Sequence, residues 1–147
     1  MKEKKTTLPS VAVIGRTNVG KSTIFNLLCT GQKALVSKTP GTTRDRRTGT
    51  VHWLDREFIL VDTAGLDVDS EELIDKESVA QAEKAIKQVD LILFVVDVRD
   101  GLMPQDKEYA KLIKKAKKPT IVVINKVDSM KLMNELSDFE KLGFKDL

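Results

Sequence analysis

Short apolar runs alternate along the chain with stretches in which apolar residues recur every three or four positions. Apolar runs bounded by turn residues are typical of buried strands, and the longer repeat is typical of helices. The runs predict strands at residues 11–14, 48–54, 56–62, 91–97 and 120–125. The repeats predict helices that begin near residue 21 and cover residues 79–89, 109–116 and 132–139. The chain is therefore predicted to be an α/β protein.

Each predicted helix carries an apolar stripe that is expected to face the core. The stripes are Ile24, Leu27 and Leu28; Val79, Ala82, Ile86 and Val89; Tyr109, Leu112, Ile113 and Ala116; and Leu132, Leu136 and Phe139. Gly143 is the predicted C-terminal cap of the last helix. Strands that alternate with helices predict a mostly parallel sheet with helices on both faces. A hairpin of strands 48–54 and 56–62, joined at Asp55, is the expected antiparallel element.

Three polar stretches lack any periodicity. Residues 1–9 are expected to form a flexible tail, and residues 31–45 and 66–76 are predicted to be long loops. Long loops in compact domains are usually functional or disordered.

The first predicted strand runs into a glycine-rich loop and then a helix. Gly15 is followed by four residues and then by Gly20, Lys21 and Ser22, which is the G-x-x-x-x-G-K-[ST] pattern of phosphate-binding loops. A helix N-terminus presents unpaired N–H groups and a partial positive charge to an anion. Lys21 is predicted to add its charge at the β- and γ-phosphates, and the Ser22 hydroxyl to ligate Mg²⁺. The predicted phosphate-binding residues are Gly15, Arg16, Thr17, Asn18, Val19, Gly20, Lys21, Ser22 and Thr23.

The predicted strand 56–62 ends in a second motif, Asp62-Thr63-Ala64-Gly65. Asp62, at the strand end, is predicted to hold Mg²⁺ through a water molecule. Gly65 is predicted to place its amide against the γ-phosphate, so that the segment after it is ordered by a triphosphate and released after hydrolysis. Thr63, Ala64 and Leu66 are also assigned to the nucleotide site.

The strand 120–125 leads into a third motif, Asn125-Lys126-Val127-Asp128, which is predicted to bind the base. A carboxylate at Asp128 can accept from N1–H and the exocyclic amine of guanine, whereas adenine has no donor at these positions. The Lys126 stem is predicted to cover one face of the base, and Asn125 either to reach its N7 or to brace the phosphate loop. Because ligands bind beyond the carboxyl ends of parallel strands, the three motifs are expected to converge. The sequence predicts a guanine-nucleotide site.

The composition fits one globular domain, with 41% hydrophobic and 32% charged residues over 147 positions. No apolar run approaches the roughly 20 residues of a spanning helix, so no membrane partner is expected and a cytoplasmic location is the default. Cys29, the single cysteine, is predicted to be a buried small hydrophobe. His52 and Trp53 in the hairpin are interpreted as structural or solvent-facing.

The net charge is +3, and lysines cluster at Lys2, Lys4 and Lys5 and at Lys114, Lys115, Lys117 and Lys118. Such clusters suit RNA phosphates. They also suit a solvated face with cations at a helix C-terminus, which is the favoured interpretation.

The segments GRTNVGKS, GTTRD, DTAGL and NKVD, in this order, resemble the translation-factor-related class of Ras-like P-loop GTPases. Within that class the chain is similar to the first G domain of the TrmE-Era-EngA-like double-GTPase family Der, also called EngA. The likeness extends over AIKQVDLILFVVDVRDGLMPQD and FEKLGF. The resemblance implies a Ras-like fold and hydrolysis of GTP to GDP with Mg²⁺. It further implies a role in assembling the large ribosomal subunit, with that subunit or its RNA, and not DNA, as the partner.

The same resemblance assigns roles to single residues. Thr43 is the threonine that closes over Mg²⁺ and the γ-phosphate, and Asn18 binds a K⁺ ion that supplies the charge an arginine finger supplies elsewhere. Leu66 stands where other GTPases use a glutamine to orient water, so a low intrinsic rate stimulated by K⁺ over Na⁺ is expected. Thr17 replaces the family's usual proline at a position that supplies backbone. The implied catalytic residues are Lys21, Thr43, Asn18 and Gly65.

The family's first domain continues past FEKLGF into a strand, a Ser-Ala loop that contacts guanine, and a last helix. The resemblance therefore implies that residues 10–147 are a G domain truncated before these parts, with reduced stability and weaker guanine binding. A GTP-hydrolysing switch is the leading prediction. A GDP- or GTP-binding assembly module with little turnover is the alternative, and an ATP-dependent kinase would leave Asp128 unexplained.

Overall fold

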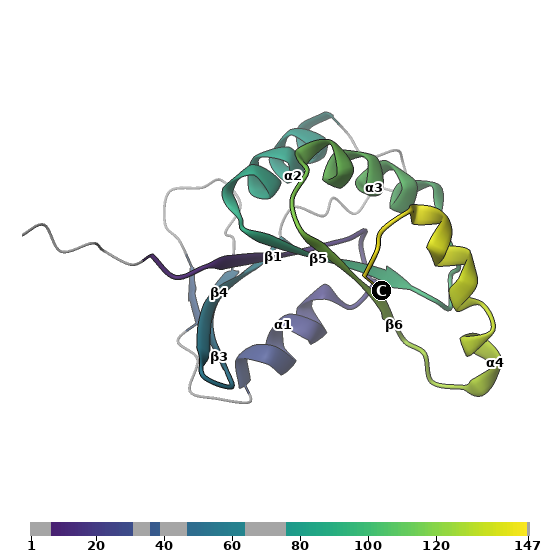
Figure 1. Ribbon diagram of the computed structural model, residues 1–147, viewed down its shortest axis with the longest axis horizontal. Coiled ribbons are helices and arrows are strands. Elements are labelled where there is room, and N and C mark those ends of the chain that lie inside the picture. The colour runs from purple at the N-terminus through teal and green to yellow at the C-terminus, as the bar shows by residue number, and fades with distance from the viewer. Residues whose placement is uncertain (1–6, 31–35, 39–46, 64–75, 147) are drawn as a thin grey trace, which may run out of the picture.

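The structure is a computed structural model that describes residues 7–30, 36–38, 47–63 and 76–146. Helices and strands alternate along most of the chain (Figure 1). The elements are β1 (Ser10–Ile14), α1 (Lys21–Thr30), β2 (Val36–Lys38), β3 (Arg47–Trp53), β4 (Arg56–Asp62), α2 (Lys76–Gln88), β5 (Leu91–Asp97), α3 (Pro104–Ala116), β6 (Thr120–Asn125), α4 (Met130–Met133) and a 3-10 helix (Leu136–Leu142). The predicted α/β class is confirmed.

The strands form a six-stranded sheet in the order β2-β3-β4-β1-β5-β6. β1 pairs in parallel with β4 on one side and β5 on the other, and β6 continues the parallel part beside β5. β3 is antiparallel to β4, as the predicted hairpin requires, and β2 adds a further antiparallel strand. The register sets Val13 opposite Asp62 and Asp97 opposite Asn125. The carboxyl ends of β1, β4, β5 and β6 therefore meet at one edge of the sheet.

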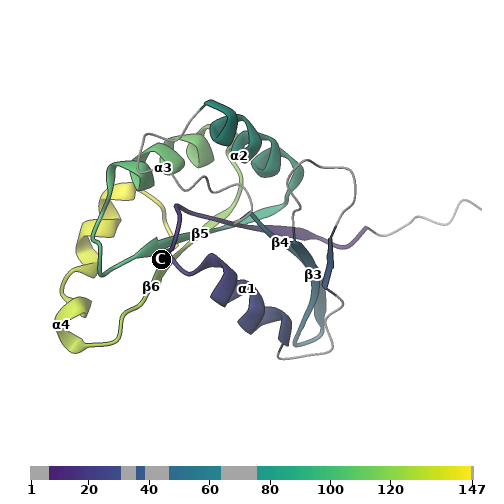
Figure 2. The same cartoon turned by 180° about the vertical axis from the view of Figure 1, so that it is seen from behind.

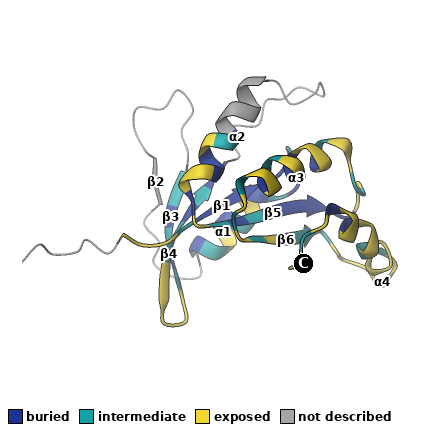
Figure 3. Cartoon of the chain, turned by 45° about the horizontal axis from the view of Figure 1, so that its top comes forward, coloured by how far each residue is buried: buried dark blue, intermediate teal, exposed yellow. Residues whose placement is uncertain are grey.

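Helices cover both faces of the sheet, as predicted. α2 and α3 lie on one face and α1 lies on the other, and the view from behind shows the same layers (Figure 2). Alternate strand residues supply the two cores: Val11 and Val13 face the α1 side, whereas Ala12 and Ile14 face α2 and α3. Burial is greatest along the central strands (Figure 3).

Helix α1 buries its predicted stripe only in part and adds two residues outside that stripe. Phe25 and Cys29 are buried, whereas Leu27 is 72% exposed. The predicted Leu27 contact is wrong, because Leu27 lies on the outer side of a helix that packs on β4, β3 and β1. Ile24 and Leu28 are half-buried against the same core, as predicted. A methyl group on Gly49 of β3 would lie 2.6 Å from Cys29 Sγ, so the missing side chain lets the helix approach. Burial raises the pKa of the Cys29 thiol, which fits its predicted role as a small hydrophobe.

The predicted stripes of the helices on the other face are better placed. Ala82, Ile86 and Val89 are buried beside α3, as are Tyr109 and Ile113 within it. Val79 lies outside the residues whose side chains the structure describes. The predicted last helix is divided into α4 and the 3-10 helix, and Gly143 caps the latter at φ 77° with its N–H donating to the Glu140 carbonyl over 2.9 Å.

Strand β6 is less buried than its apolar sequence predicts. Val122 is its buried residue, and Ile121 is 39% exposed, because β6 stands at the end of the sheet. On the side away from β5, the pairing of β6 within the described residues is an isolated parallel bridge between Ile121 and Asp146. Beside it, a groove of about 840 Å³ runs along the α1 face between the helix and the hairpin, lined among others by Leu27, Phe58, Leu91, Leu93 and Ile121.

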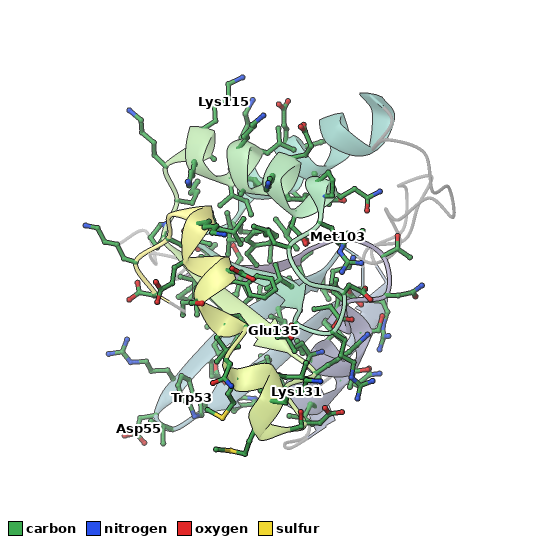
Figure 4. All side chains as sticks on the ribbon, turned by 90° about the vertical axis from the view of Figure 1, so that its right-hand side faces the viewer. Trp53, Asp55, Met103, Lys115, Lys131 and Glu135 are labelled. Atoms are coloured by element: carbon green, nitrogen blue, oxygen red, sulfur yellow. The ribbon has the colours of Figure 1, made fainter. Side chains whose placement is uncertain are left out.

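The hairpin turn takes one residue more than predicted. β3 ends at Trp53, so Leu54 and Asp55 together form the turn, with Leu54 at φ 53°. Trp53 and Asp55 lie side by side at the tip of the hairpin, far from Met103 at the start of α3 (Figure 4). His52 Nδ1 lies 2.6 Å from Glu57 Oε1 on the facing strand, so the histidine has a cross-strand partner.

Candidate nucleotide site

Residues 15–20 join β1 to α1. Both ends of this loop are glycine, and at both positions a side chain would collide with neighbouring residues of the protein, even without a bound phosphate. A methyl group on Gly15 would lie 2.4 Å from the Val95 carbonyl oxygen. Gly20 has φ 103°, and a methyl group there would lie 2.2 Å from Asn125 Nδ2. The glycines predicted from phosphate binding thus also serve the packing of the loop against β5 and β6.

Lys21, the first residue of α1, turns back into the loop that precedes it. Its side chain is buried, with 3% of the residue exposed, and Nζ donates to the Gly15 carbonyl over 2.5 Å and to the Arg16 carbonyl over 2.8 Å. A buried ammonium group is retained only where it is paired and hydrogen-bonded. The loop therefore encloses a fixed positive charge.

The segment after β6 braces the same loop. Asn125 Nδ2 donates to the Val19 carbonyl over 2.9 Å, and Lys126 Nζ donates to the Asn18 carbonyl over 2.8 Å. Of the two roles predicted for Asn125, the structure shows the brace. In a trans peptide the C=O and N–H point in opposite directions, so the amides of Val19 and Gly20 face away from this segment. They are available to an anion on the other side of the loop.

Asp97, at the end of β5, holds Lys126 in place. The Lys126 Nζ to Asp97 Oδ2 distance is 2.7 Å, and the Arg99 amide donates to Asp97 Oδ1 over 2.8 Å. Burial opposes ionisation of this carboxyl, but its hydrogen bonds to Lys126 and Arg99 and the charges of Lys126 and Arg16 hold the pKa of Asp97 below its ordinary value. Asp97 is therefore ionised at neutral pH and fixes the lysine that contacts the phosphate loop.

The turn between β5 and α3 adds ion pairs that the motif patterns did not identify. Arg16 pairs with Asp100 at 2.9 Å, and its Nε lies 3.3 Å from Asp106 Oδ1. Arg99 pairs with Asp128. The sequence signal was the run of charges after the buried strand 91–97, but only the folded chain reveals their partners.

Asp106 is fully buried at the start of α3. Its Oδ2 accepts from the Met103 amide over 2.9 Å, which caps the helix. Burial raises the pKa of the Asp106 carboxyl against the opposing effects of the Met103 amide and Arg16. The Arg16 side chain is thereby directed to α3 and away from the centre of the loop.

Asp62 is the last residue of β4, and Thr63 follows it at the end of the sheet that carries the phosphate loop. Asp62 is 2% exposed, and Thr63 Oγ1 donates to the Val13 carbonyl over 2.6 Å, at the end of the neighbouring strand. The carboxylate of Asp62 and the exposed hydroxyl of Ser22 are hard oxygen ligands of the kind that Mg²⁺ prefers. This donor set fits the predicted magnesium site.

The remaining predicted residues divide into three groups. Thr17 is half-buried in the phosphate loop. Thr23, Val127 and Asp128 are exposed, as is Asn18 with φ 65°. Thr43, Ala64, Gly65 and Leu66 lie outside the described residues.

The fold and the site define a class of protein. A mostly parallel sheet, a G-x-x-x-x-G-K-S loop around a buried lysine, an acid at the end of β4 and a bracing Asn-Lys-x-Asp segment characterise a P-loop GTPase domain of Ras-like fold.

Residues 10–126 match the model of the 50S ribosome-binding GTPase family, and the chain belongs to that family. It is 52% identical over 134 residues to GTPase Der of Caldanaerobacter subterraneus subsp. tengcongensis, which covers 90% of this chain and 30% of the relative. It is 49% identical over 134 residues to GTPase Der of Thermoanaerobacter pseudethanolicus, again with 90% and 30% coverage. The chain thus spans about a third of the length of these curated relatives.

Solved structures agree with this placement. The structure of Era in complex with MgGDPNP and part of 16S ribosomal RNA superposes with a TM-score of 0.70 at 31% identity, covering 94% of this chain and 49% of that one. The G domain of the T. maritima FeoB iron transporter gives a TM-score of 0.68 at 24% identity, covering 94% and 84%. At 24% identity, the similarity to the FeoB G domain shows a shared fold and no more.

Proposed function

We propose that this chain binds GTP and hydrolyses it to GDP and phosphate as a molecular switch. The observation that carries the proposal is the enclosed Lys21 ammonium beside the Asn125–Asp128 segment. The cation and the loop amides are proposed to bind a polyphosphate. Asp128, at the end of the Asn125–Asp128 segment, is proposed to accept hydrogen bonds from the guanine edge. Discrimination against adenine follows, because an unpaired carboxylate in a closed base pocket is costly.

The residues contribute mainly by position and charge. Lys21 and the loop amides stabilise the negative charge that develops on the phosphoryl oxygens as water attacks. Ser22 and Asp62 are proposed to hold Mg²⁺, which when bound neutralises charge on the β- and γ-phosphates. Thr43 and Gly65 keep their predicted roles at the γ-phosphate.

A K⁺ ion at Asn18 is the finer part of the proposal. The Asn18 carbonyl accepts from Lys126 Nζ, and the residue is exposed on the phosphate loop. The Asn18 side chain is therefore accessible to an ion from solvent. A monovalent cation there would supply the positive charge that an arginine finger supplies in other GTPases, whereas Leu66 lacks the polar group that would orient the attacking water. The expected low intrinsic activity belongs to the same proposal.

Assembly of the large ribosomal subunit, with the subunit or its RNA as partner, is proposed from the family description and the relatives. Era, a structural neighbour, was solved with 16S ribosomal RNA. The lysine cluster of α3 gives this partner little support. Lys115 projects outward from α3 (Figure 4), and Lys114 Nζ lies 5.3 Å from the ring centre of Phe144. Both suit a helix C-terminus as well as RNA.

Two further predictions stay open. Among the described residues no helix is long and apolar enough to cross a bilayer, and the cytoplasmic location stays a prediction. The incomplete G domain of residues 10–147 likewise stays a prediction.

Multiple-turnover phosphate release from GTP, with Mg²⁺ and either K⁺ or Na⁺, tests the proposed hydrolysis. We expect turnover in K⁺, a smaller rate in Na⁺, and loss of this difference in Asn18→Ala. Lys21→Ala should lower the rate by roughly 10²–10³, the effect of removing one preorganised electrostatic contact.

The outcomes separate the alternatives. Tight GDP binding without turnover would support the assembly module with little hydrolysis. Displacement of labelled GDP by ATP as readily as by GTP would support the kinase and remove the role proposed for Asp128. Equal rates in K⁺ and Na⁺ would remove the K⁺ site alone.

A further inference from the structure

The carboxylate proposed to select guanine is already engaged within the protein. The Arg99 guanidinium donates to Asp128 Oδ2, and both side chains are about half exposed, at 55% and 54%. The pairing partner of Asp128 thus comes from the turn after β5, not from the segment that carries Asp128 itself.

The Arg99 side chain starts from a fixed turn. Its own amide donates to Asp97 over 2.8 Å, and the Val98 amide donates to the Asn125 carbonyl over 3.2 Å. On the far side of the turn, Asp100 pairs with Arg16. These contacts tie the turn both to the phosphate loop and to the segment after β6, and so hold Arg99 opposite Asp128.

Arg99 and guanine offer Asp128 the same chemistry. A guanidinium presents N–H donors on nitrogens that share one carbon, in a planar fork that matches a carboxylate. The N1–H and the exocyclic amine of guanine are likewise donors on nitrogens attached to one carbon, C2. A carboxylate that is bonded to one fork is not available in the same geometry to the other.

We propose that Arg99 competes with guanine for Asp128 and thereby sets the affinity of the site for guanine nucleotides. The inference rests on the proposed role of Asp128 in base recognition. Nucleotide binding requires the Arg99–Asp128 pair to open, and the apparent dissociation constant is the intrinsic constant divided by the fraction of molecules in which the pair is open. Exposed ion pairs are weak, so the competition amounts to about a two- to fivefold weakening of affinity.

Calorimetric titration of this chain with GDP in Mg²⁺ and K⁺ tests the competition. Arg99→Ala should bind GDP about two- to fivefold more tightly than the unsubstituted chain. Lys141→Ala is the matched control, because it removes one partner of another exposed pair, Lys141–Asp138 at 3.3 Å. It should leave GDP affinity unchanged. Urea unfolding without nucleotide confirms that the variants are folded.

Arg99 could also affect nucleotide affinity through its attraction to the phosphates. The effect of Arg99→Ala in an Asp128→Asn variant distinguishes this attraction from competition for Asp128. Asp128→Asn exchanges an acceptor for a donor, and should prefer xanthosine diphosphate, whose C2 carries a carbonyl in place of the amine. In that background the guanidinium has lost its carboxylate, so Arg99→Ala should not tighten binding of xanthosine diphosphate.

Unchanged or weaker GDP binding by Arg99→Ala, or an equal gain in both backgrounds, would overturn the competition. If Asp128→Asn still prefers GDP to xanthosine diphosphate, the proposed base recognition by Asp128 fails instead. The two failures are therefore distinguishable.

Discussion

At the scale of single residues, two glycines with positive φ have different surroundings. Gly20 (φ 103°) faces Asn125 Nδ2, whereas Gly101 (φ 69°) has nothing within 4 Å of the place where a methyl group would be added. A substitution by alanine would strain the backbone at both positions, but of the two only Gly20→Ala would also place the new methyl group against a neighbouring side chain.

Gly20→Ala is expected to lower the free energy of unfolding by about 2–4 kcal/mol, from backbone strain together with loss of the Asn125–Val19 hydrogen bond. Gly101→Ala should cost roughly 1–2 kcal/mol, from its left-handed conformation alone. Urea denaturation measures both. Equal losses in the two variants would show that the contact with Asn125 has no energetic weight.

Single residues also mark the limit of motif patterns. The spacing of Gly15, Gly20, Lys21 and Ser22 predicted the loop and its chemistry, because local backbone requirements determine that pattern. Arg99 and Asp100 fit no such pattern, since their roles depend on partners 29 and 84 positions away in the chain. Their charges were visible in the sequence, but their pairing was not.

At the scale of elements, α1 shows how tertiary contact selects among apolar residues. Ile24, Leu27 and Leu28 satisfy helical spacing, and so do Phe25 and Cys29. The folded helix buries Phe25 and Cys29 fully and Ile24 and Leu28 partly, and it leaves Leu27 exposed. Phe25 and Cys29 face Gly49 of β3, and Arg47 of the same strand stacks on Phe25 at 4.7 Å from the ring centre. Periodicity predicts a helix but does not by itself fix its rotation about its axis.

Phe25→Ala should therefore lower the free energy of unfolding by about 3–5 kcal/mol, the usual cost of emptying a buried aromatic site. Leu27→Ala, two positions along the same helix, should change it by no more than about 0.5 kcal/mol, because the side chain is 72% exposed. Thermal or urea unfolding of both variants makes the comparison. A larger loss for Leu27→Ala would mean that the groove beside α1 is filled in solution.

At the scale of the whole molecule, the site joins segments that are distant in the chain. The phosphate loop follows β1, the ion-paired turn follows β5 and the bracing segment follows β6. These strands are neighbours in the sheet. A nucleotide that contacts both the phosphate loop and Asp128 would link β1 to β6 across β5 and stabilise the fold as a unit.

GDP at about 100 times its dissociation constant should add about 2.7 kcal/mol to the free energy of unfolding, which corresponds to a rise in Tm of roughly 5–10 °C. ADP at the same concentration should give no comparable rise, and Asp128→Asn should lose most of the GDP effect. Differential scanning calorimetry measures each shift. An equal rise with ADP would show that the phosphates alone, without the base, account for binding.

The α/β class, the hairpin, the phosphate loop and the order of the motifs could be predicted from the residues alone, because they depend on local periodicity and on glycine and lysine at fixed spacing. The side of α1 that is buried, the brace from Asn125 to the phosphate loop and the Arg99–Asp128 pair became known only from the folded chain. These outcomes depend on how strands far apart in the chain are brought together, and a linear pattern carries no direct record of that proximity.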